Sequence, residues 1–182
     1  SVIVTNAAPV GNPDSASTPE DTPVSGNVLD NDTDSDPGDS KTVSQFVVDG
    51  VTVAVPPGAV GGSTTIAGVG TLTLKADGSY SFTPLADWNG NLPTVTYTLR
   101  DVAGATATAT LDITVTPVAD ITADSVSTNS TAGVTFNPLA GTNGATTDTF
   151  DDATAAISAI GDASHGSAVL NPDGTITYTP TP

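Results

Sequence analysis

One stretch of the chain occurs twice. Residues 70–84 return as residues 166–180, an offset of 96, and in both copies an Asp-Gly pair separates two segments in which apolar and polar residues alternate. An Asp-Gly pair in that setting is the strongest short-range signal for a β-hairpin. Earlier in the repeat, residues 14–18 return as residues 124–128, an offset of 110. The sequence therefore predicts two tandem units of roughly 95–110 residues, each built around a hairpin.

Alternation of apolar and polar residues extends over much of the chain. It is clearest in residues 105–116, where small or branched apolar side chains take one face and Thr or Asp the other, and it recurs in residues 51–55 and 95–99. A period of two indicates strands with one buried and one solvated face. No segment carries a convincing apolar stripe of helical period, although residues 153–160 could form a brief helical turn. We therefore expect an all-β fold whose units have the size of an immunoglobulin-like sandwich.

The two offsets also predict where the units begin and end. They differ by 14 residues, which we assign to additional chain within the Gly- and Pro-rich residues 56–70 of the first copy. Pro182 aligns with Ala86, so the second copy lacks counterparts of residues 87–117, while residues 1–5 resemble the end of the first copy. The expected division is residues 1–8 for the closing strand of a preceding unit and a linker, 9–117 for the first sandwich, and 118–182 for a second sandwich without its last two strands.

Residues 30–39 concentrate negative charge. The loop reads Asp-Asn-Asp-Thr-Asp-Ser-Asp-Pro-Gly-Asp, with five carboxylates and no cation. Two unit charges about 4 Å apart repel by roughly 4 kcal/mol in a half-buried setting, so a folded loop of this kind needs a counterion. Short oxygen ligands at alternate positions and a Pro-Gly bend suit Ca²⁺, which takes about six to eight oxygens. The alternative is a solvated acidic loop with no bound ion.

Composition limits the partners. The chain has 20 acidic residues against 3 basic ones, a net charge of -17, and a hydrophobic share of 37% that is too high for a disordered tail. A surface of this charge repels nucleic acid and anionic lipid headgroups, so we expect no nucleic-acid partner and no direct membrane insertion. There is no Cys. A metal is the usual alternative to disulfides for stabilising a small secreted domain.

Several motifs together resemble a known family. They are Pro-Glu-Asp-Thr-Pro at 19–23, Asn-Val-Leu-Asp-Asn-Asp-Thr-Asp at 27–34, Ala-Asp-Gly-Ser-Tyr-Ser-Phe-Thr-Pro at 76–84, Asp-Trp-Asn-Gly at 87–90 and Thr-Tyr-Thr-Leu-Arg-Asp at 96–101. As a set they resemble the tandem cadherin-like or VCBS-type immunoglobulin-like repeats of large bacterial surface adhesins exported by type I secretion, including the RTX adhesins of biofilm formers. The resemblance covers the first unit and the available part of the second.

The resemblance implies an extracellular stalk. In that family, repeated sandwiches hold an adhesive tip away from the bacterial cell surface, and calcium bound in loops and near domain junctions stiffens the rod. For this chain it implies a Ca²⁺ site in the first unit, with Asp30, Asp32 and Asp101 as the first choices. The full set of expected ligands is Glu20, Asp30, Asp32, Asp34, Asp36, Asp39 and Asp101. In the second unit the offset of 110 places residues 140–142 (Ala-Gly-Thr) opposite residues 30–32, so that copy is expected to have lost the site.

Other residues considered for function have simpler roles. His165 is the only histidine and has no Cys or adjacent acid with which to form a zinc or nucleophilic site. Trp88 could be a sugar-stacking platform, but a single Trp in a sandwich is more often buried in the core. Asp residues on wet loops offer no pocket that separates two pKa values, so no enzyme activity is expected. A different metal site could use Asp148, Asp151 and Asp152.

Three functions of different class remain open. The first is a calcium-stiffened spacer whose partners are neighbouring repeats of the same chain. The second is a carbohydrate-binding module, which would need exposed aromatic residues, whereas aromatic residues make up only 4% of the chain. The third is an extracellular filament subunit, in which other copies of the chain complete the second unit by β-strand addition.

Overall fold

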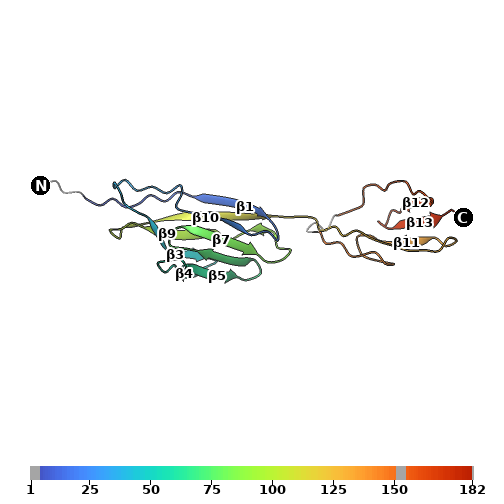
Figure 1. Cartoon of the computed structure of the whole chain (residues 1–182), viewed down its shortest axis with the longest axis horizontal. Coiled ribbons are helices and arrows are strands. Elements are labelled where there is room, and N and C mark those ends of the chain that lie inside the picture. Colours follow the sequence, from blue (N-terminus) through green and yellow to red (C-terminus); the bar gives the residue numbers. More distant parts are fainter. Residues whose placement is uncertain (1–4, 151–154, 182) are drawn as a thin grey trace. The chain divides into compact units, whose positions relative to one another are not determined.

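The computed structural model describes residues 5–150 and 155–181. These residues form strands, turns and irregular segments with no helix among them, so the expected all-β class is confirmed (Figure 1). Without a helix, the described residues also contain no helical membrane span. The chain divides into Ser1–Pro117 and Val118–Pro182, which we call unit 1 and unit 2. Of the strand expected in residues 1–5, residues 1–4 lie outside the described residues.

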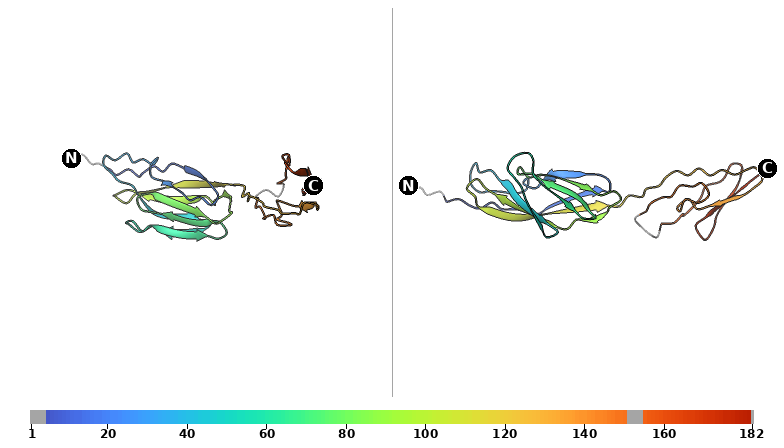
Figure 2. Two further views of the ribbon diagram at one scale, coloured as in Figure 1. Left: turned by 45° about the vertical axis from the view of Figure 1, so that its right-hand side comes forward. Right: turned by 90° about the horizontal axis from the view of Figure 1, so that it is seen from below.

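Unit 1 is a sandwich of two sheets (Figures 1 and 2). The first sheet has the order β1-β10-β9-β3-β4, and β8 also pairs with β10. Its strands are β1 (Asp14–Pro19), β3 (Thr42–Val48), β4 (Val51–Ala54), β8 (Gly90–Asn91), β9 (Val95–Arg100) and β10 (Thr106–Thr116). The second sheet has the order β2-β7-β6-β5. Its strands are β2 (Val24–Asn27), β5 (Gly62–Ile66), β6 (Gly70–Leu74) and β7 (Ser79–Pro84).

Two Asp-Gly pairs form turns between neighbouring strands of unit 1. In the predicted β6–β7 hairpin, Gly78 has a φ of 84°, a conformation that costs glycine little. Asp77 Oδ1 accepts hydrogen bonds from the Ser79 N–H at 3.0 Å and the Ser79 hydroxyl at 2.6 Å, which lowers the pKa of Asp77. Between β3 and β4, Asp49 and Gly50 have φ values of 50° and 74°, as a two-residue hairpin turn requires. This second turn was not predicted from the sequence.

Strand β1 runs parallel to β10. Asp14 lies opposite Leu111 and Pro19 opposite Thr116. A strand of six residues spans about 20 Å. β1 therefore carries the chain about 20 Å along the sheet, and Glu20, which follows it, lies roughly that far from Asp14.

The hydrophobic core lies between the two sheets. Phe46, Tyr97 and Leu111 of the first sheet are no more than 1% exposed, and Leu72 and Phe82 of the second sheet are fully buried at 0%. Burying side chains of this size contributes about 1.5–3 kcal/mol each. The alternation seen in the sequence is thus the alternation between core and solvent.

Unit 2 repeats the hairpin and its partner strand. Its sheet has the order β11-β13-β12, formed by β11 (Val134–Phe136), β12 (Gly166–Leu170) and β13 (Ile176–Pro180). Val134 pairs with Tyr178 as Val24 pairs with Phe82 in unit 1, which matches the two sequence offsets. Gly174, in the turn between β12 and β13, has a φ of 81°. The repeat in the sequence is therefore also a repeat in three dimensions.

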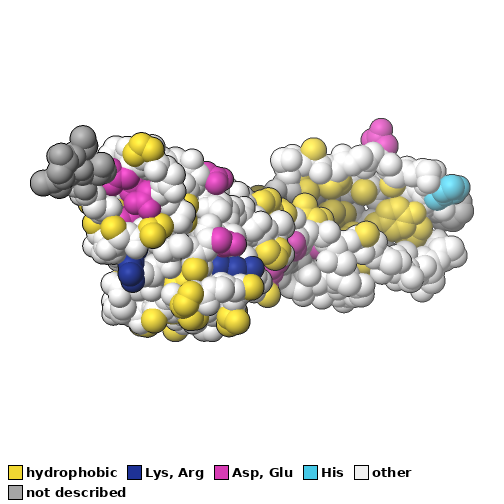
Figure 3. Space-filling view, turned by 60° about the vertical axis from the view of Figure 1, so that its left-hand side comes forward, with side chains coloured by type: hydrophobic (Ala, Val, Ile, Leu, Met, Phe, Trp, Pro, Cys, Tyr) yellow, Lys and Arg dark blue, Asp and Glu magenta, His cyan; other side chains and the backbone are white. Residues whose placement is uncertain are grey.

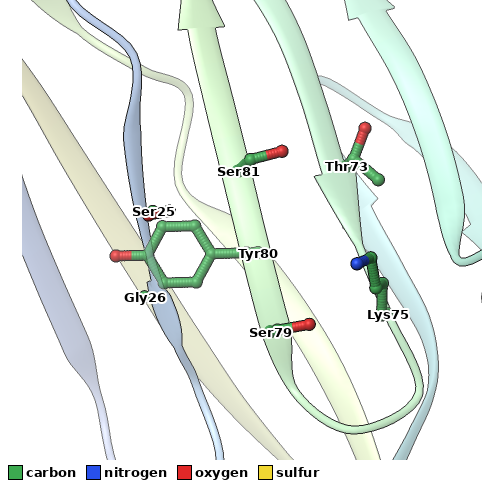
Figure 4. Close-up of a pocket in the computed structure, with 7 residues that line it drawn as sticks. All are labelled: Ser25, Gly26, Thr73, Lys75, Ser79, Tyr80 and Ser81. Atoms are coloured by element: carbon green, nitrogen blue, oxygen red, sulfur yellow. The ribbon is translucent and has the colours of Figure 1, made fainter. Parts of the chain in front are cut away.

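One cross-strand pair carries its aromatic ring on opposite strands in the two units. In unit 1, Gly26 of β2 lies opposite Tyr80 of β7, and Figure 4 shows the Tyr80 ring extending over β2 beside Gly26. A Cβ atom on Gly26 would lie 2.8 Å from the Tyr80 ring. In unit 2 the corresponding pair is Phe136 and Ile176, with the ring on β11. Each pair combines an aromatic with a smaller side chain, so the volumes of the two positions compensate.

The remainder of unit 2 packs loosely. Of its described residues only Ala145 and Asp148 are buried, at 9% and 8% exposed. Residues 155–160 form neither helix nor strand, and residues 153–154 lie outside the described residues. The helical turn expected in residues 153–160 is therefore wrong for the part that is described, because those residues have no packed surface against which an amphipathic turn would be stable.

Candidate metal site

The acidic loop, residues 30–39, is hydrogen-bonded to the leading segment of unit 1, residues 6–13. Val10 and Thr33 exchange backbone hydrogen bonds of 2.8 and 3.0 Å. The Asn12 N–H donates to Asp32 Oδ1 at 2.6 Å. These contacts fix the base of the loop against the sandwich.

Three carboxylates of the loop come together at its tip. Oxygen atoms of Asp34, Asp36 and Asp39 lie within 4.8 Å of one another, and all three side chains are half-buried. The backbone turns through Gly38, which has a φ of 84°. Asp34 Oδ1 accepts the Asp36 N–H at 2.9 Å, whereas Asp34 Oδ2 is buried with no hydrogen-bond partner among the described residues. We call these three residues the carboxylate cluster; Figure 3 shows acidic side chains (magenta) gathered in unit 1.

The leading segment is held by two acids. The Ala7 N–H donates to Asp36 Oδ2 at 2.7 Å, and the Asn6 side-chain amide donates to Asp101 Oδ2 at 2.8 Å. Asp101 Oδ1 accepts the N–H groups of Gly104 at 2.6 Å and Ala105 at 2.8 Å. The hydrogen bond from Asn6 and those from the turn lower the pKa of Asp101. Asp101 therefore caps the β9–β10 turn and ties it to the leading segment.

Asp32 and Asp14 share a tyrosine hydroxyl. The Tyr97 Oη atom lies 3.0 Å from Asp14 Oδ2, 3.0 Å from Asp32 Oδ2, 2.9 Å from the Val28 carbonyl and 3.3 Å from the Asn12 carbonyl. A phenol has one proton to donate, so four acceptors compete for it. Burial is the main cause that raises the pKa of Tyr97 and also that of Asp14. Asp32 Oδ1 accepts the Asn12 N–H and Asp32 Oδ2 shares the Tyr97 hydroxyl with the other acceptors, which makes Asp32 an anchor of the loop.

The structure separates the expected ligands into different places. Glu20 is buried at the far end of β1, where its N–H donates to the Thr116 carbonyl at 2.9 Å and Asn89 lies 3.5 Å from Oε2. Asp30 is exposed and lies outside the carboxylate cluster. The three first choices, Asp30, Asp32 and Asp101, are thus not the acids that the structure brings together.

Unit 2 repeats the contacts at the base of the loop. Asp120 and Thr149 exchange two backbone hydrogen bonds of 3.2 Å. The Thr122 N–H donates to Asp148 Oδ1 at 2.7 Å. These are the contacts that the leading segment makes in unit 1, so Asp148 occupies the place of Asp32.

This correspondence corrects the sequence alignment of the loops. Residues 140–142 do not oppose residues 30–32, because unit 2 has additional chain before Asp148. Asp151 and Asp152, the other acids considered for a site in unit 2, lie outside the described residues. A metal site in unit 2 formed by Asp148, Asp151 and Asp152 therefore stays a prediction.

Trp88 does not present a free ring for stacking on a sugar. It packs against the core of unit 1, with its ring edge-on to Phe82 at a centroid distance of 6.3 Å and an interplanar angle of 75°. The nearby face of the second sheet has a shallow hollow of about 350 Å³ lined mainly by hydroxyl side chains around Tyr80 (Figure 4). Tyr80 itself is 9% exposed, so its ring is also mostly covered.

The chain was compared with known proteins. No curated protein matches it in sequence. One similar solved structure is a nucleoside hydrolase-related hypothetical protein from Saccharophagus degradans that is associated with carbohydrate metabolism, with 19% identity, 61% of this chain covered and a TM-score of 0.36; the match spans 26% of that protein's chain. Another is murine CEACAM1b, with 17% identity, 96% of this chain and 85% of that chain covered, and a TM-score of 0.36.

The similarity to these two solved structures is too distant to support any conclusion about this chain. A family match, in contrast, identifies the family of the chain. The model for the bacterial cadherin-like domain matches residues 6–117, which is more than half of the chain and nearly the whole of unit 1. The matched residues include the leading segment, the acidic loop and both sheets. The chain therefore belongs to the bacterial cadherin-like domain family.

Proposed function

We propose that unit 1 is a calcium-stabilised extender module of a bacterial surface adhesin, of the kind found in the stalks of RTX adhesins. Bacterial cadherin-like domains are typically extracellular modules of the adhesion type. The observation that carries the proposal is the carboxylate cluster, in which the buried Asp34 Oδ2 has no hydrogen-bond partner among the described residues. A buried, charged oxygen without a donor is costly unless a cation satisfies it.

The cluster fits Ca²⁺. Its donors are carboxylate oxygens only, which suit a hard cation and not a thiolate- or imidazole-seeking metal. Two charges 4.8 Å apart repel by about 3–4 kcal/mol at an effective dielectric constant of about 20. Asp34, Asp36 and Asp39 would hold the ion, and main-chain and water oxygens would complete its shell of about six to eight ligands. The ion would supply the positive charge that the loop lacks.

Asp36 links this cluster to the start of the sandwich. It belongs to the carboxylate cluster and also accepts the Ala7 N–H. An ion that fixes Asp36 would therefore fix the leading segment, whose neighbouring residue Asn6 is held by Asp101. In this way calcium would stiffen the leading segment at the start of unit 1, which is what a stalk module requires.

The proposal is tested by thermal unfolding with Ca²⁺ and with EDTA. Extracellular calcium modules have dissociation constants of about 10⁻⁴–10⁻³ M, so a tenfold excess of free Ca²⁺ stabilises unit 1 by about 1.4 kcal/mol per site. That corresponds to a rise of about 5 °C in Tm for a domain of this size. Asp34→Asn should abolish the rise, and the exposed Asp30→Asn should retain it. An unchanged Tm in the unsubstituted chain, or an equal response of both variants, would contradict the assignment.

A further inference from the structure

β1 and β10, the first and last strands that the structure describes in unit 1, are direct neighbours. They pair in parallel along all six residues of β1, from Asp14 opposite Leu111 to Pro19 opposite Thr116 (Figure 1). The chain therefore enters this ladder at one end, before Asp14, and leaves it at the other end, after Thr116. Tension along the chain pulls the two strands in opposite directions along their own axes, so the ladder is loaded in shear.

β10 is also held on its other side. β9 pairs with residues 106–111 and β8 pairs with Thr114 and Val115, whereas the only described strand that pairs with β1 is β10. Sliding β1 along β10 by one residue, about 3.3 Å, breaks every pair of the ladder at once. Peeling the strands apart from one end releases one pair for each extension of about 6–7 Å. Shear therefore requires more force than peeling for the same ladder.

Contacts at both ends of the ladder keep it from fraying. At the end where the chain leaves, the Glu20 N–H donates to the Thr116 carbonyl at 2.9 Å, and the Thr116 hydroxyl donates to the Thr18 carbonyl at 3.4 Å. At the end where the chain enters, the Tyr97 hydroxyl lies 3.0 Å from Asp14 Oδ2. The Thr18 side chain is 5% exposed, so β1 is also anchored by burial.

The direction of each N–H group shows which residues of β1 face β10. Glu20 donates to β10, and N–H groups alternate in direction along a strand, so those of Ala16 and Thr18 also point toward β10. The N–H of Ser17 points toward the open edge of the sheet. Pro19, which has no N–H, occupies another position that faces this edge, as a proline in an edge strand must.

We propose that the β1–β10 ladder is the mechanical clamp of unit 1, which carries tension along the chain and sets the force at which this unit unfolds. The proposal rests on the proposed stalk function only for its purpose, since a stalk module transmits tension. None of the three residues of the carboxylate cluster belongs to the ladder, so the clamp does not need calcium.

The test is single-molecule force spectroscopy of the full chain in EDTA, with handles on two engineered cysteines, because the chain has no Cys. Pro13→Cys with Ala119→Cys loads the ladder in shear and leaves unit 2 outside the force path. Thr22→Cys with Ala119→Cys places both handles at the end where β10 leaves, so pairs break singly whether β1 or β2 yields first. All three positions are exposed. We expect the shear force to exceed the peeling force at least about threefold. Equal forces, or a higher force in peeling, would overturn the proposal.

Two proline variants locate the resistance in β1. Ala16→Pro removes an N–H that faces β10 and should lower the shear force by at least about a third, whereas Ser17→Pro removes one that faces the edge and should retain it. Neither should change the peeling force, because peeling begins at Pro19. Equal shear forces for the two variants would overturn the proposal. Should Ala16→Pro not fold, the comparison of the two pulling geometries decides alone.

Calcium separates this inference from the proposed function. With the handle at Pro13 the leading segment lies outside the force path, so the shear force should be the same in Ca²⁺ and in EDTA. A shear force that falls to the peeling force in EDTA would overturn the clamp. A Tm that does not respond to Ca²⁺ would contradict the calcium site and leave the expected forces unchanged.

Discussion

Replacing Tyr97 by phenylalanine tests the hydrogen bonds that join the acidic loop to the sandwich. The ring is 0% exposed and would stay in place, so Tyr97→Phe removes only the hydroxyl. The loss leaves Asp14 Oδ2, Asp32 Oδ2 and the Val28 carbonyl without the donor they share. A hydrogen bond to a charged group contributes about 1.5–3 kcal/mol. Because two carboxylates would then face each other without a proton between them, we expect the upper part of that range, about 2–3 kcal/mol.

Urea unfolding in EDTA, followed by fluorescence of Trp88, measures this change in unit 1 alone, since Trp88 is the only Trp of the chain and packs on the unit 1 core. A loss of 2–3 kcal/mol corresponds to a fall of about 10 °C in Tm. The matched control is Tyr80→Phe, at a ring that is also mostly buried and whose hydroxyl senses the Asp14 charge but makes none of the hydrogen bonds found among the described residues; we expect it to change stability by less than about 0.5 kcal/mol. If Tyr97→Phe costs no more than this control, the reasoning about the shared hydroxyl is wrong.

Three further predictions concern individual positions. Gly26→Phe should cost about 3 kcal/mol by overpacking against Tyr80, and the double variant with Tyr80→Ile, which copies the pair in unit 2, should recover more than half in a double-mutant cycle. Gly78→Ala should destabilise unit 1 in urea by more than the roughly 1–2 kcal/mol that its φ of 84° costs a residue with a Cβ, because the new Cβ would also collide with neighbouring side chains. At Gly174 a Cβ would meet no neighbour, so Gly174→Ala should lower hydrogen-exchange protection in unit 2 only by the cost of the positive φ. Burial raises the pKa of Asp14 above its ordinary 3.8, so its contribution to stability is complete below about pH 3.8 and is lost as the pH rises through the folded-state pKa. Asp14→Asn removes this titrating group, so the difference in stability between the unsubstituted chain and the variant should change over this pH range. Parallel pH–stability curves for the two proteins would contradict the prediction.

Much of the fold follows from local signals in the sequence. The Asp-Gly hairpin at residues 75–79 and its copy in unit 2 form as predicted, because Gly supplies the positive φ and Asp77 bonds its own turn. The alternation in β10 predicts its buried face correctly, since a period of two fixes which side chains share a side. The strand β5 inside the Gly-rich residues 56–70 was not predicted, because its sequence Gly-Ser-Thr-Thr-Ile carries no alternation of large apolar and polar side chains.

The grouping of the site residues could not be predicted in the same way. Alternation does not reveal which strand is the neighbour, so the parallel pairing of β1 with β10, which carries Glu20 away from the acidic loop, has no local signal. The roles of Asp32 and Asp34 depend on whether a donor from elsewhere in the chain reaches them: Tyr97 reaches Asp32, and no donor reaches Asp34 Oδ2 among the described residues. Such contacts between distant segments are set by tertiary packing.

The most direct test of the account measures hydrogen exchange of the Ala7 backbone amide with and without calcium. This amide donates to Asp36 Oδ2, so it reports whether an ion at the carboxylate cluster stiffens the leading segment of the sandwich. With tenfold excess Ca²⁺ the account predicts exchange about tenfold slower than in EDTA, the equivalent of about 1.4 kcal/mol. Asp34→Asn should remove the difference. Exchange at Ala7 that is the same in calcium and in EDTA, in a chain that remains folded in both, would contradict the proposal that calcium stiffens this module.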